Sequence, residues 1–165
     1  MLVLGIDPGS LRTGYGLVEG NRDLVRPLQF GTIITSPKDP FPHRLQKIYD
    51  GLKGLIDAHH PEWVALESPF IAKNVQSAFK LGQSKGVALL AAVHGGIPIA
   101  EYTPTQVKSV VTGYGAAEKR QIQQMVKETL GLSEVPKSPD VADALAIALC
   151  HIYSHSSRKR LGLSS

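Results

Sequence analysis

The sequence predicts an α/β fold, a mixed five-stranded sheet flanked by helices, and three observations lead to it. A short apolar run at 2–7 ends at Pro8-Gly9, which is typical of a buried strand that enters a turn. Two segments rich in β-favouring residues follow without any helical pattern. Beyond them, helix-like and strand-like segments alternate, as they do where crossover helices cover a sheet.

The first third of the chain is expected to form three antiparallel strands, at 2–7, 13–19 and 24–35. Glu19-Gly20-Asn21 separates the second strand from the third and predicts a hairpin turn. After a break rich in proline at 36–40, apolar residues recur at helical spacing and predict a helix with one face against a sheet. These residues are Leu45, Ile48, Leu52, Leu55 and Ile56.

Strands and helices alternate in the rest of the chain. The expected elements, in order, are a strand at 63–66 that ends in Glu67, a helix at 74–93, a strand at 97–102, and helices at 104–111, 117–130 and 140–153. Ser138-Pro139 gives the last helix an N-cap followed by a favourable first residue. Residues 1–155 are therefore expected to form one domain, and residues 156–165 a basic, disordered tail.

Composition excludes several classes of protein. With 165 residues, 42% hydrophobic and 19% charged, the chain suits a soluble globule of one domain and not a disordered or fibrous protein. No apolar run approaches the roughly 20 residues of a membrane span, and Met1–Ile6 has no basic region before it, so we expect a cytoplasmic protein without a signal peptide. The single cysteine, Cys150, excludes an intrachain disulfide and a cysteine-rich zinc site, and it is expected to be buried.

Positive charge gathers in the middle of the chain. Lys and Arg number 18 against 14 Asp and Glu, which gives a formal net charge of +4 and a pI of about 9.2. Residues 68–137 hold 8 basic and 4 acidic side chains, whereas residues 1–67 hold 7 and 8. This excess permits a polyanionic partner such as nucleic acid but does not by itself establish one.

Four acidic residues stand out by their position. Asp7 ends the first strand and Glu67 the fourth, while Asp140 and Asp143 lie three residues apart and so share one face of the last helix. Asp143 interrupts the apolar run 141–149, where a carboxylate without a partner is costly to bury. If the first and fourth strands are neighbours, Asp7 and Glu67 meet at one sheet edge, and the last helix can lay its two carboxylates over them.

Such a cluster needs cations. Two like charges about 4 Å apart repel by roughly 4 kcal/mol at an effective dielectric constant of about 20. Mg²⁺ prefers hard oxygen ligands, and two such ions about 3.5–4 Å apart can hold a phosphate for in-line attack by water. Asp7 as a turn residue, Glu67 as a chance strand end and Asp140 as a partner of the helix dipole are the alternatives for each acid alone. Together with Asp143 they predict metal-dependent phosphoryl chemistry.

Several short sequence blocks follow one another from about residue 2 to residue 155. The chain opens with Gly5-Ile6-Asp7-Pro8-Gly9-Ser10, and its centre carries Glu67-Ser68-Pro69-Phe70, Ala72-Lys73-Asn74 and the run Leu81–Val87. The later blocks are Gln106-Val107-Lys108, the run Gly113–Lys119 and the run Asp140–Ala146. In their order and spacing these blocks resemble the RuvC family of Holliday-junction endonucleases. One departure is Ser68-Pro69, because bulkier residues are commoner in the family between this glutamate and this phenylalanine.

The resemblance implies an RNase H-like nuclease domain that resolves Holliday junctions in homologous recombination and DNA repair. It places Asp7, Glu67, Asp140 and Asp143 at the catalytic metal-ligand positions, with two Mg²⁺ ions per active site for which Mn²⁺ can substitute. It further implies a homodimer that nicks two opposing strands of four-way junction DNA symmetrically and leaves ligatable 5′-phosphate and 3′-hydroxyl ends. The branch-migration complex of RuvA and RuvB is implied as a partner, in the bacterial cytoplasm.

Seven further positions are expected to contact DNA: Phe70, Lys73, Lys80, Lys85, Lys108, Lys119 and Arg120. By the resemblance, Phe70 wedges into the junction and stacks on a base, which is worth about 1–3 kcal/mol; a phenylalanine of the core or of a dimer contact is the alternative. Lys108 and Lys119 match family lysines near the scissile phosphate, where they would neutralise charge. The other lysines rest on location alone, and a solvated face is the alternative for each.

Three other functions stand beside this one. The first is a RuvC-related RNase H-like nuclease that acts on structured RNA, of the pre-rRNA processing type, although such proteins are shorter and lack the central block. The second is a sugar kinase or actin-like ATPase, which shares the Gly-Ile-Asp-x-Gly strand but needs two such domains. The third is a catalytically inactive junction-binding module, against which the presence of all four acids argues.

Overall fold

The computed structural model describes residues 1–68 and 74–160 and confirms the predicted order of strands and helices. The strands are β1 (Leu2–Asp7), β2 (Arg12–Gly20), β3 (Val25–Ile34), β4 (Trp63–Glu67) and β5 (Ile99–Tyr102). The helices are α1 (Phe41–His59), α2 (Val75–His94), α3 (Pro104–Thr112), α4 (Lys119–Thr129) and α5 (Pro139–Arg160).

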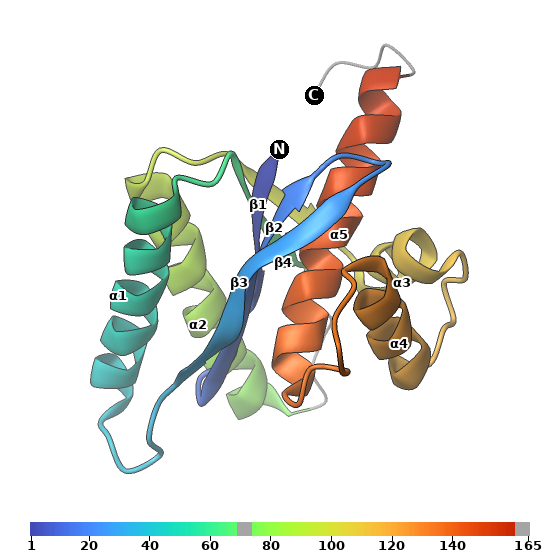
Figure 1. Cartoon of the computed structure of the whole chain (residues 1–165). Helices are drawn as coiled ribbons and strands as arrows, with labels where there is room; N and C mark the ends of the chain where they lie inside the picture. The colour runs from blue at the N-terminus through green and yellow to red at the C-terminus, as the bar shows by residue number, and fades with distance from the viewer. Residues whose placement is uncertain (69–73, 161–165) are drawn as a thin grey trace.

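The five strands form one mixed sheet in the order β3-β2-β1-β4-β5. β1 pairs antiparallel with β2 and parallel with β4, so it is the central strand and lies beside the strand that ends in Glu67. Figure 1 shows α1 and α2 on one face of the sheet, and α5 across the other face with α3 and α4 beside it. The predicted α/β class, a mixed sheet between helices, is confirmed.

Two apolar cores lie on the two faces of the sheet because successive side chains of a strand point to opposite sides. In β1, Leu4 and Ile6 pack toward α1 and α2, whereas Val3 packs toward α5. The core between the sheet and the helices α1 and α2 includes the buried residues of the apolar stripe predicted for α1, namely Ile48, Leu52 and Ile56.

α5 lies directly against the backbone of the sheet at two glycines. A Cβ atom on Gly5 would lie 2.1 Å from the carbonyl oxygen of Ala144, and one on Gly14 would lie 2.0 Å from the carbonyl oxygen of Asp140. Real Cβ atoms essentially never approach another atom within 3.0 Å, so a side chain at either position would push α5 away. The two glycines therefore set how closely α5 approaches β1 and β2.

The buried part of α5 contains the single cysteine and a histidine. Cys150 is fully buried, as predicted. His151 is 2% exposed, its Nδ1 lies 2.9 Å from the hydroxyl of Tyr102, and its ring packs on Trp63 with the centroids 4.7 Å apart. Burial, followed by two basic neighbours on α5, lowers the pKa of His151 to about 4.

The hairpin turn lies later in the chain than predicted. β2 continues through Gly20, and the turn occupies 21–24. There the side-chain oxygen of Asn21 accepts hydrogen bonds from the backbone N–H groups of Asp23 and Leu24. Gly20 has a φ of 152°, and a Cβ on it would lie 2.1 Å from the carbonyl oxygen of Leu24, so both the glycine and the asparagine shape the hairpin.

The last helix is longer than predicted, because α5 extends to Arg160. The prediction of a tail is therefore wrong for 156–160, where the hydroxyls of Ser156 and Ser157 donate to carbonyl oxygens one turn earlier in the helix. Residues 161–165 lie outside the described residues. Among the helices described here, none is long and apolar enough to cross a membrane.

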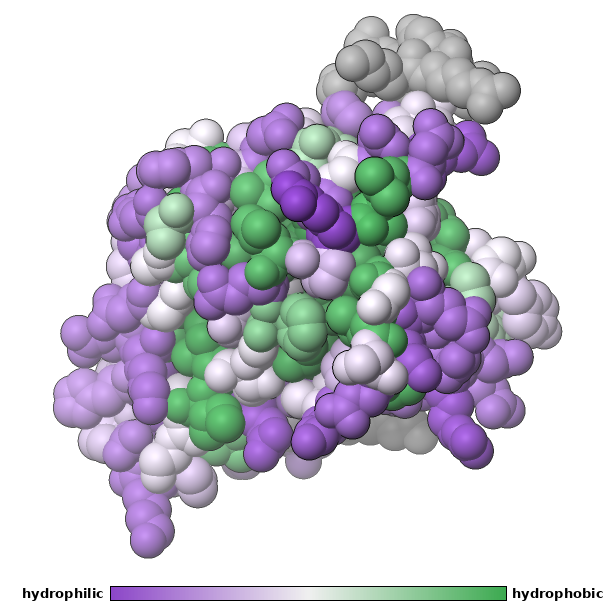
Figure 2. Space-filling view, viewed as in Figure 1, coloured by the Kyte–Doolittle hydropathy of each residue, from purple (hydrophilic) through white to green (hydrophobic). Residues whose placement is uncertain are grey.

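Part of the outer surface is apolar. Leu28, Phe30 and Ile34 of β3, which is an edge strand, are between 41% and 53% exposed. Figure 2 shows apolar residues gathered near the centre of the view, where Figure 1 draws β3, with hydrophilic residues around them. The described surface is therefore not uniformly polar.

Candidate active site

Two acidic side chains lie at one edge of the sheet because two parallel strands end there. β1 and β4 run side by side with Ile6 paired to Leu66, and the residues that follow are Asp7 and Glu67. On the other side of β1, Asp7 pairs with Gly14 of β2. The expected pairing of the first and fourth strands is confirmed, and it brings these two carboxylates to the same edge.

The first turn of α5 lies over this edge and adds two more carboxylates. Asp140 and Asp143 are three residues apart at the start of the helix, and the backbone of Asp140 lies against Gly14. Ser138 precedes the helix and donates a hydrogen bond from its hydroxyl to Oδ2 of Asp140 at 3.2 Å. Asp140 is thus held by the segment that leads into α5.

Burial and mutual repulsion raise the pKa values of the two acids that end strands. The pKa of Asp7 rises from 3.8 to about 7, first because of burial and then because of the charges of Asp143, Glu67 and Asp140. The pKa of Glu67 is raised as well, again by burial first and by Asp143 second. The carboxylates are therefore near enough to oppose one another's ionisation, and a bound cation would relieve this opposition.

Two of the predicted lysines lie beside the carboxylates. Nζ of Lys119, the first residue of α4, donates to Oδ2 of Asp143 at 2.9 Å, and this hydrogen bond raises the pKa of Lys119. Lys108 of α3 and Lys119 both partly offset the raised pKa of Glu67. Glu67, Asp143 and the two lysines line one hollow of about 210 Å³, so acidic and basic groups face the same space.

The chemistry of these side chains fits divalent cations. Carboxylate oxygens are the hard ligands that Mg²⁺ prefers, and the raised pKa of Asp7 indicates negative charge that its surroundings do not compensate. In the part of the chain that the structure describes, no three His, Cys, Asp or Glu side chains are grouped as ligands of one ion. Two of the four acids contact protein partners instead, Asp143 with Lys119 and Asp140 with Ser138. Binding of a cation would have to replace these two contacts.

The other predicted DNA contacts lie on several surfaces. Phe70 and Lys73 lie outside the described residues, and Lys80 is exposed on α2. Lys85, in contrast, is only 7% exposed, and its Nζ donates to Oε2 of Glu101 of β5 at 2.9 Å. A phosphate contact by Lys85 would require the loss of this ion pair, so in this structure its ammonium group is not part of the exposed basic surface.

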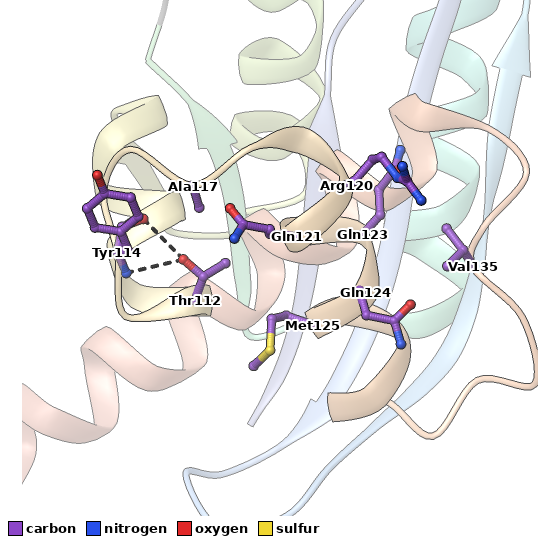
Figure 3. A pocket seen from close by; sticks show the side chains of 9 residues that line it. All are labelled: Thr112, Tyr114, Ala117, Arg120, Gln121, Gln123, Gln124, Met125 and Val135. Carbon is purple, nitrogen blue, oxygen red and sulfur yellow. Dashed lines mark hydrogen bonds between the residues drawn. The ribbon is translucent and has the colours of Figure 1, made fainter.

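A larger hollow of about 530 Å³ lies along another side of α4 (Figure 3). Arg120 and Gln124 line it from α4, and Thr112 and Tyr114 line it from the end of α3 and the segment that follows. None of the four carboxylates lines this hollow. Arg120 lines the larger hollow and Lys119 lines the smaller one, so these consecutive basic residues lie on different surfaces of the protein.

Two polar residues near the site, the buried Arg44 and the exposed Glu101, were not predicted from the sequence. Arg44 of α1 is 8% exposed and hydrogen-bonds to Ser10, three residues after Asp7. It lies four residues before Ile48, so a charged residue on the apolar stripe is the signal that could have found it. Glu101, the partner of the buried lysine of α2, carries no such local signal.

Comparisons with known proteins agree along the chain. The family model described as crossover junction endodeoxyribonuclease RuvC matches residues 3–151. The protein of that name from Chloroflexus aurantiacus is 48% identical over 164 residues, which cover 99% of this chain and 100% of that protein. The one from Desulforamulus reducens is 51% identical over 153 residues, which cover 92% of this chain and 93% of that protein.

A solved structure extends the likeness to three dimensions. T. thermophilus RuvC in complex with Holliday junction substrate superposes with a TM-score of 0.92 at 37% identity, over 95% of this chain and 96% of that chain. The sheet and helices described above therefore have the RNase H-like fold of RuvC, as the resemblance implies. The chain belongs to the RuvC family of crossover junction endodeoxyribonucleases.

Proposed function

We propose that this chain is an endonuclease that resolves Holliday junctions by nicking two opposing strands symmetrically, in homologous recombination and DNA repair. The observation that carries the proposal is the group of four carboxylates at the ends of β1 and β4 and the start of α5, with Lys108 and Lys119 beside it. A site that joins carboxylates to lysines suits a phosphodiester bound between cations. Membership of the RuvC family supports a DNA junction over structured RNA as the substrate.

In this proposal Asp7, Glu67, Asp140 and Asp143 hold divalent cations, two Mg²⁺ per active site with Mn²⁺ as a substitute. When bound, these cations supply activation of the attacking water and stabilisation of negative charge on the leaving oxygen. The four acids oppose one another's ionisation in the protein alone, so we expect loss of the proton from Asp7 to accompany binding of the cations.

The two lysines hold the phosphate in this proposal. Nζ of Lys119 already lies 2.9 Å from Asp143 and would move to a phosphate oxygen when that carboxylate turns to a cation. Lys108 lines the same hollow from α3, so two ammonium groups reach the phosphodiester from different helices. Their charge neutralises the phosphate, and their attachment to separate helices fixes its position.

We further propose that the working form is a homodimer, because paired nicks need two sets of carboxylates and one chain carries one. α2 offers a candidate interface between two copies. Six of its residues recur at helical spacing along one face: Val75, Phe79, Gly82, Gly86, Leu90 and Val93. The four apolar ones are between 47% and 69% exposed, and a Cβ built on either glycine meets no atom within 4 Å, so a second helix can approach closely.

Nicking of a synthetic four-way junction tests the proposal. With Mg²⁺ we expect paired nicks at symmetric positions that a ligase can seal, and no nicks in EDTA or with the Asp7→Asn variant. A linear duplex of the same sequence is the control for junction specificity and should remain intact. No nicking across Mg²⁺, Mn²⁺ and several junction sequences would refute the proposal, and cleavage of structured RNA without cleavage of the junction would establish the alternative.

RuvA and RuvB are proposed as partners, and the bacterial cytoplasm as the location, because both follow from a chromosomal junction as the substrate. The nicking rate of a junction loaded with RuvA and RuvB, compared with that of the bare junction, tests the partnership. If this protein cannot bind a junction that already carries RuvA and RuvB, the proposed partnership is wrong.

A further inference from the structure

Two basic side chains are buried on the side of the sheet that α1 and α2 cover. Arg44 of α1 is 8% exposed and Lys85 of α2 is 7% exposed, and no other Lys or Arg among residues 1–68 and 74–158 is buried. Removing a charge from water destabilises a protein unless hydrogen bonds compensate for the lost hydration. The partners of these two residues therefore show what each burial achieves.

Arg44 binds the segment that follows Asp7. Its Nε and Nη2 donate to the carbonyl oxygen of Ser10 at 3.1 and 2.6 Å, and Nη2 also donates to the Ser10 hydroxyl at 3.0 Å. Thr35 donates to the same carbonyl oxygen at 2.7 Å, and the ring of Phe41 lies 5.3 Å below the guanidinium. No carboxylate of the described residues forms an ion pair with Arg44, so its guanidinium hydrogen-bonds only to Ser10 and Thr35 within the described residues.

Lys85 contacts Ser68, the residue that follows Glu67, indirectly through the carboxylate of Glu101. Its Nζ donates to Oε2 of Glu101 at 2.9 Å, and the Ser68 hydroxyl donates to the same carboxylate oxygen at 3.3 Å. The backbone N–H of Ser68 also donates to the carbonyl oxygen of Tyr102 at 2.7 Å. The residue after Glu67 is thus tied to β5, and the carboxylate that ties it is anchored from α2.

We propose that Arg44 and Lys85 are positioning residues that hold the ends of β1 and β4, and with them Asp7 and Glu67, at the separation that cation binding needs. The inference rests on the proposed function of these two acids as metal ligands. Carboxylates that repel one another push the strand ends apart, and bonds on the face opposite α5 resist that movement. A misplacement of about 1 Å can slow an enzyme by about 100-fold, so such anchoring affects catalysis without any contact to DNA.

Four variants and two controls test the inference. Arg44→Met and Lys85→Met remove the charge and keep an unbranched side chain, and Arg44→Lys and Lys85→Arg are the conservative partners. Arg26→Met and Lys53→Met are matched controls, because each removes the same group from an ion pair away from the carboxylates, on β3 and α1. The controls should behave as the unmodified protein in every measurement.

The first measurement needs no DNA. Mg²⁺ should raise the melting temperature of the unmodified protein, and each methionine variant should need about tenfold more Mg²⁺ for half of the shift. In single-turnover nicking at saturating junction, the methionine variants should be slower by at least about tenfold, while the junction Kd in EDTA stays within about twofold. The conservative variants should recover most of both losses.

Several outcomes would overturn the inference. Methionine variants that bind Mg²⁺ and nick as the unmodified protein does, after correction for the folded fraction, would leave the two residues a purely structural role. Weaker junction binding by Lys85→Met at an unchanged Mg²⁺ requirement would make Lys85 a phosphate contact. If a methionine variant does not fold, Ser10→Ala and Glu101→Gln loosen the same two segments more gently and are judged by the same measurements. Failure of the unmodified protein to nick would refute the proposed function, whereas the Mg²⁺ titration would still judge the positioning role.

Discussion

Replacement of Gly14 by alanine tests whether the closeness of α5 to the sheet creates the site. Gly14 lies on β2 opposite Asp7, and an added Cβ would stand 2.0 Å from the carbonyl oxygen of Asp140. Since Cβ atoms essentially never approach within 3.0 Å, the first turn of α5 must move by at least the difference, 1.0 Å. The obstacle is backbone, so rotation of a side chain does not relieve the clash.

The displacement should affect catalysis more than folding. Overpacking of this kind costs about 1–3 kcal/mol of unfolding free energy, which a folded domain tolerates. A shift of about 1 Å between Asp140 and Asp7 should slow nicking by about 100-fold. Single-turnover nicking of a four-way junction measures the rate, urea unfolding measures stability, and junction binding in EDTA should change by less than about threefold because the lysines stay in place.

Two other glycines provide controls. A Cβ on Gly54 of α1 meets nothing within 4 Å, so Gly54→Ala should stabilise the protein by about 0.5–1 kcal/mol without any effect on nicking. A Cβ on Gly16 would lie 2.6 Å from Cδ2 of Leu145, and this flexible side chain can move aside. Gly16→Ala should therefore slow nicking less than Gly14→Ala does. Wild-type nicking by a fully folded Gly14→Ala variant would refute the reasoning that the start of α5 sets the site.

Three more predictions follow from single side chains. Lys119→Met should slow nicking by at least about tenfold in single-turnover assays, and an unchanged rate would contradict this prediction. In urea melts its unfolding free energy should change by less than about 1 kcal/mol, because the lysine side chain is 56% exposed. The pKa of His151, about 4, lies below the ordinary value of 6.5, so the unfolded chain takes up the extra proton and stability falls as the pH drops from 6.5 to 4, by no more than about 3 kcal/mol. His151→Gln should flatten this fall in urea melts at pH 7 and at about pH 4.5, and equal slopes for both proteins would argue against it. Phe79→Asp should convert a dimer to a monomer in sedimentation, and an unchanged dimer would place the interface elsewhere.

The positions of the acids were predictable because they depend on patterns within single elements. Asp7 and Glu67 each end a short apolar strand, and parallel strands bring such residues to one edge. Asp140 and Asp143 share a helix face because they are three residues apart. That β1 and β4 are neighbours was a topological expectation, and the structure confirms it.

Contacts between elements far apart in the sequence were not predictable in this way. Lysine is usually a surface residue, so nothing in the sequence predicts that Lys85 is buried. It is buried because α2 packs beside β5 and brings its ammonium group to Glu101. Arg44 is four residues before Ile48, but its partner, Ser10, lies 34 residues away in the chain. The hairpin turn was predicted at Glu19-Gly20-Asn21, but β2 includes Gly20, and the turn that the side chain of Asn21 stabilises occupies 21–24.

The two-residue period of the strands explains why the acids face α5. In β1, Val3 packs on the α5 side, Gly5 lies against the backbone of that helix, and Asp7 comes next on the same side. β4 repeats the arrangement, since Ala65 packs on the α5 side and Glu67 follows two residues later. In both strands a residue with little or no side chain lets the helix approach, and the acid two positions beyond it meets the start of that helix. A shift of either strand by one residue would turn its acid toward α1 and α2 and remove it from the site.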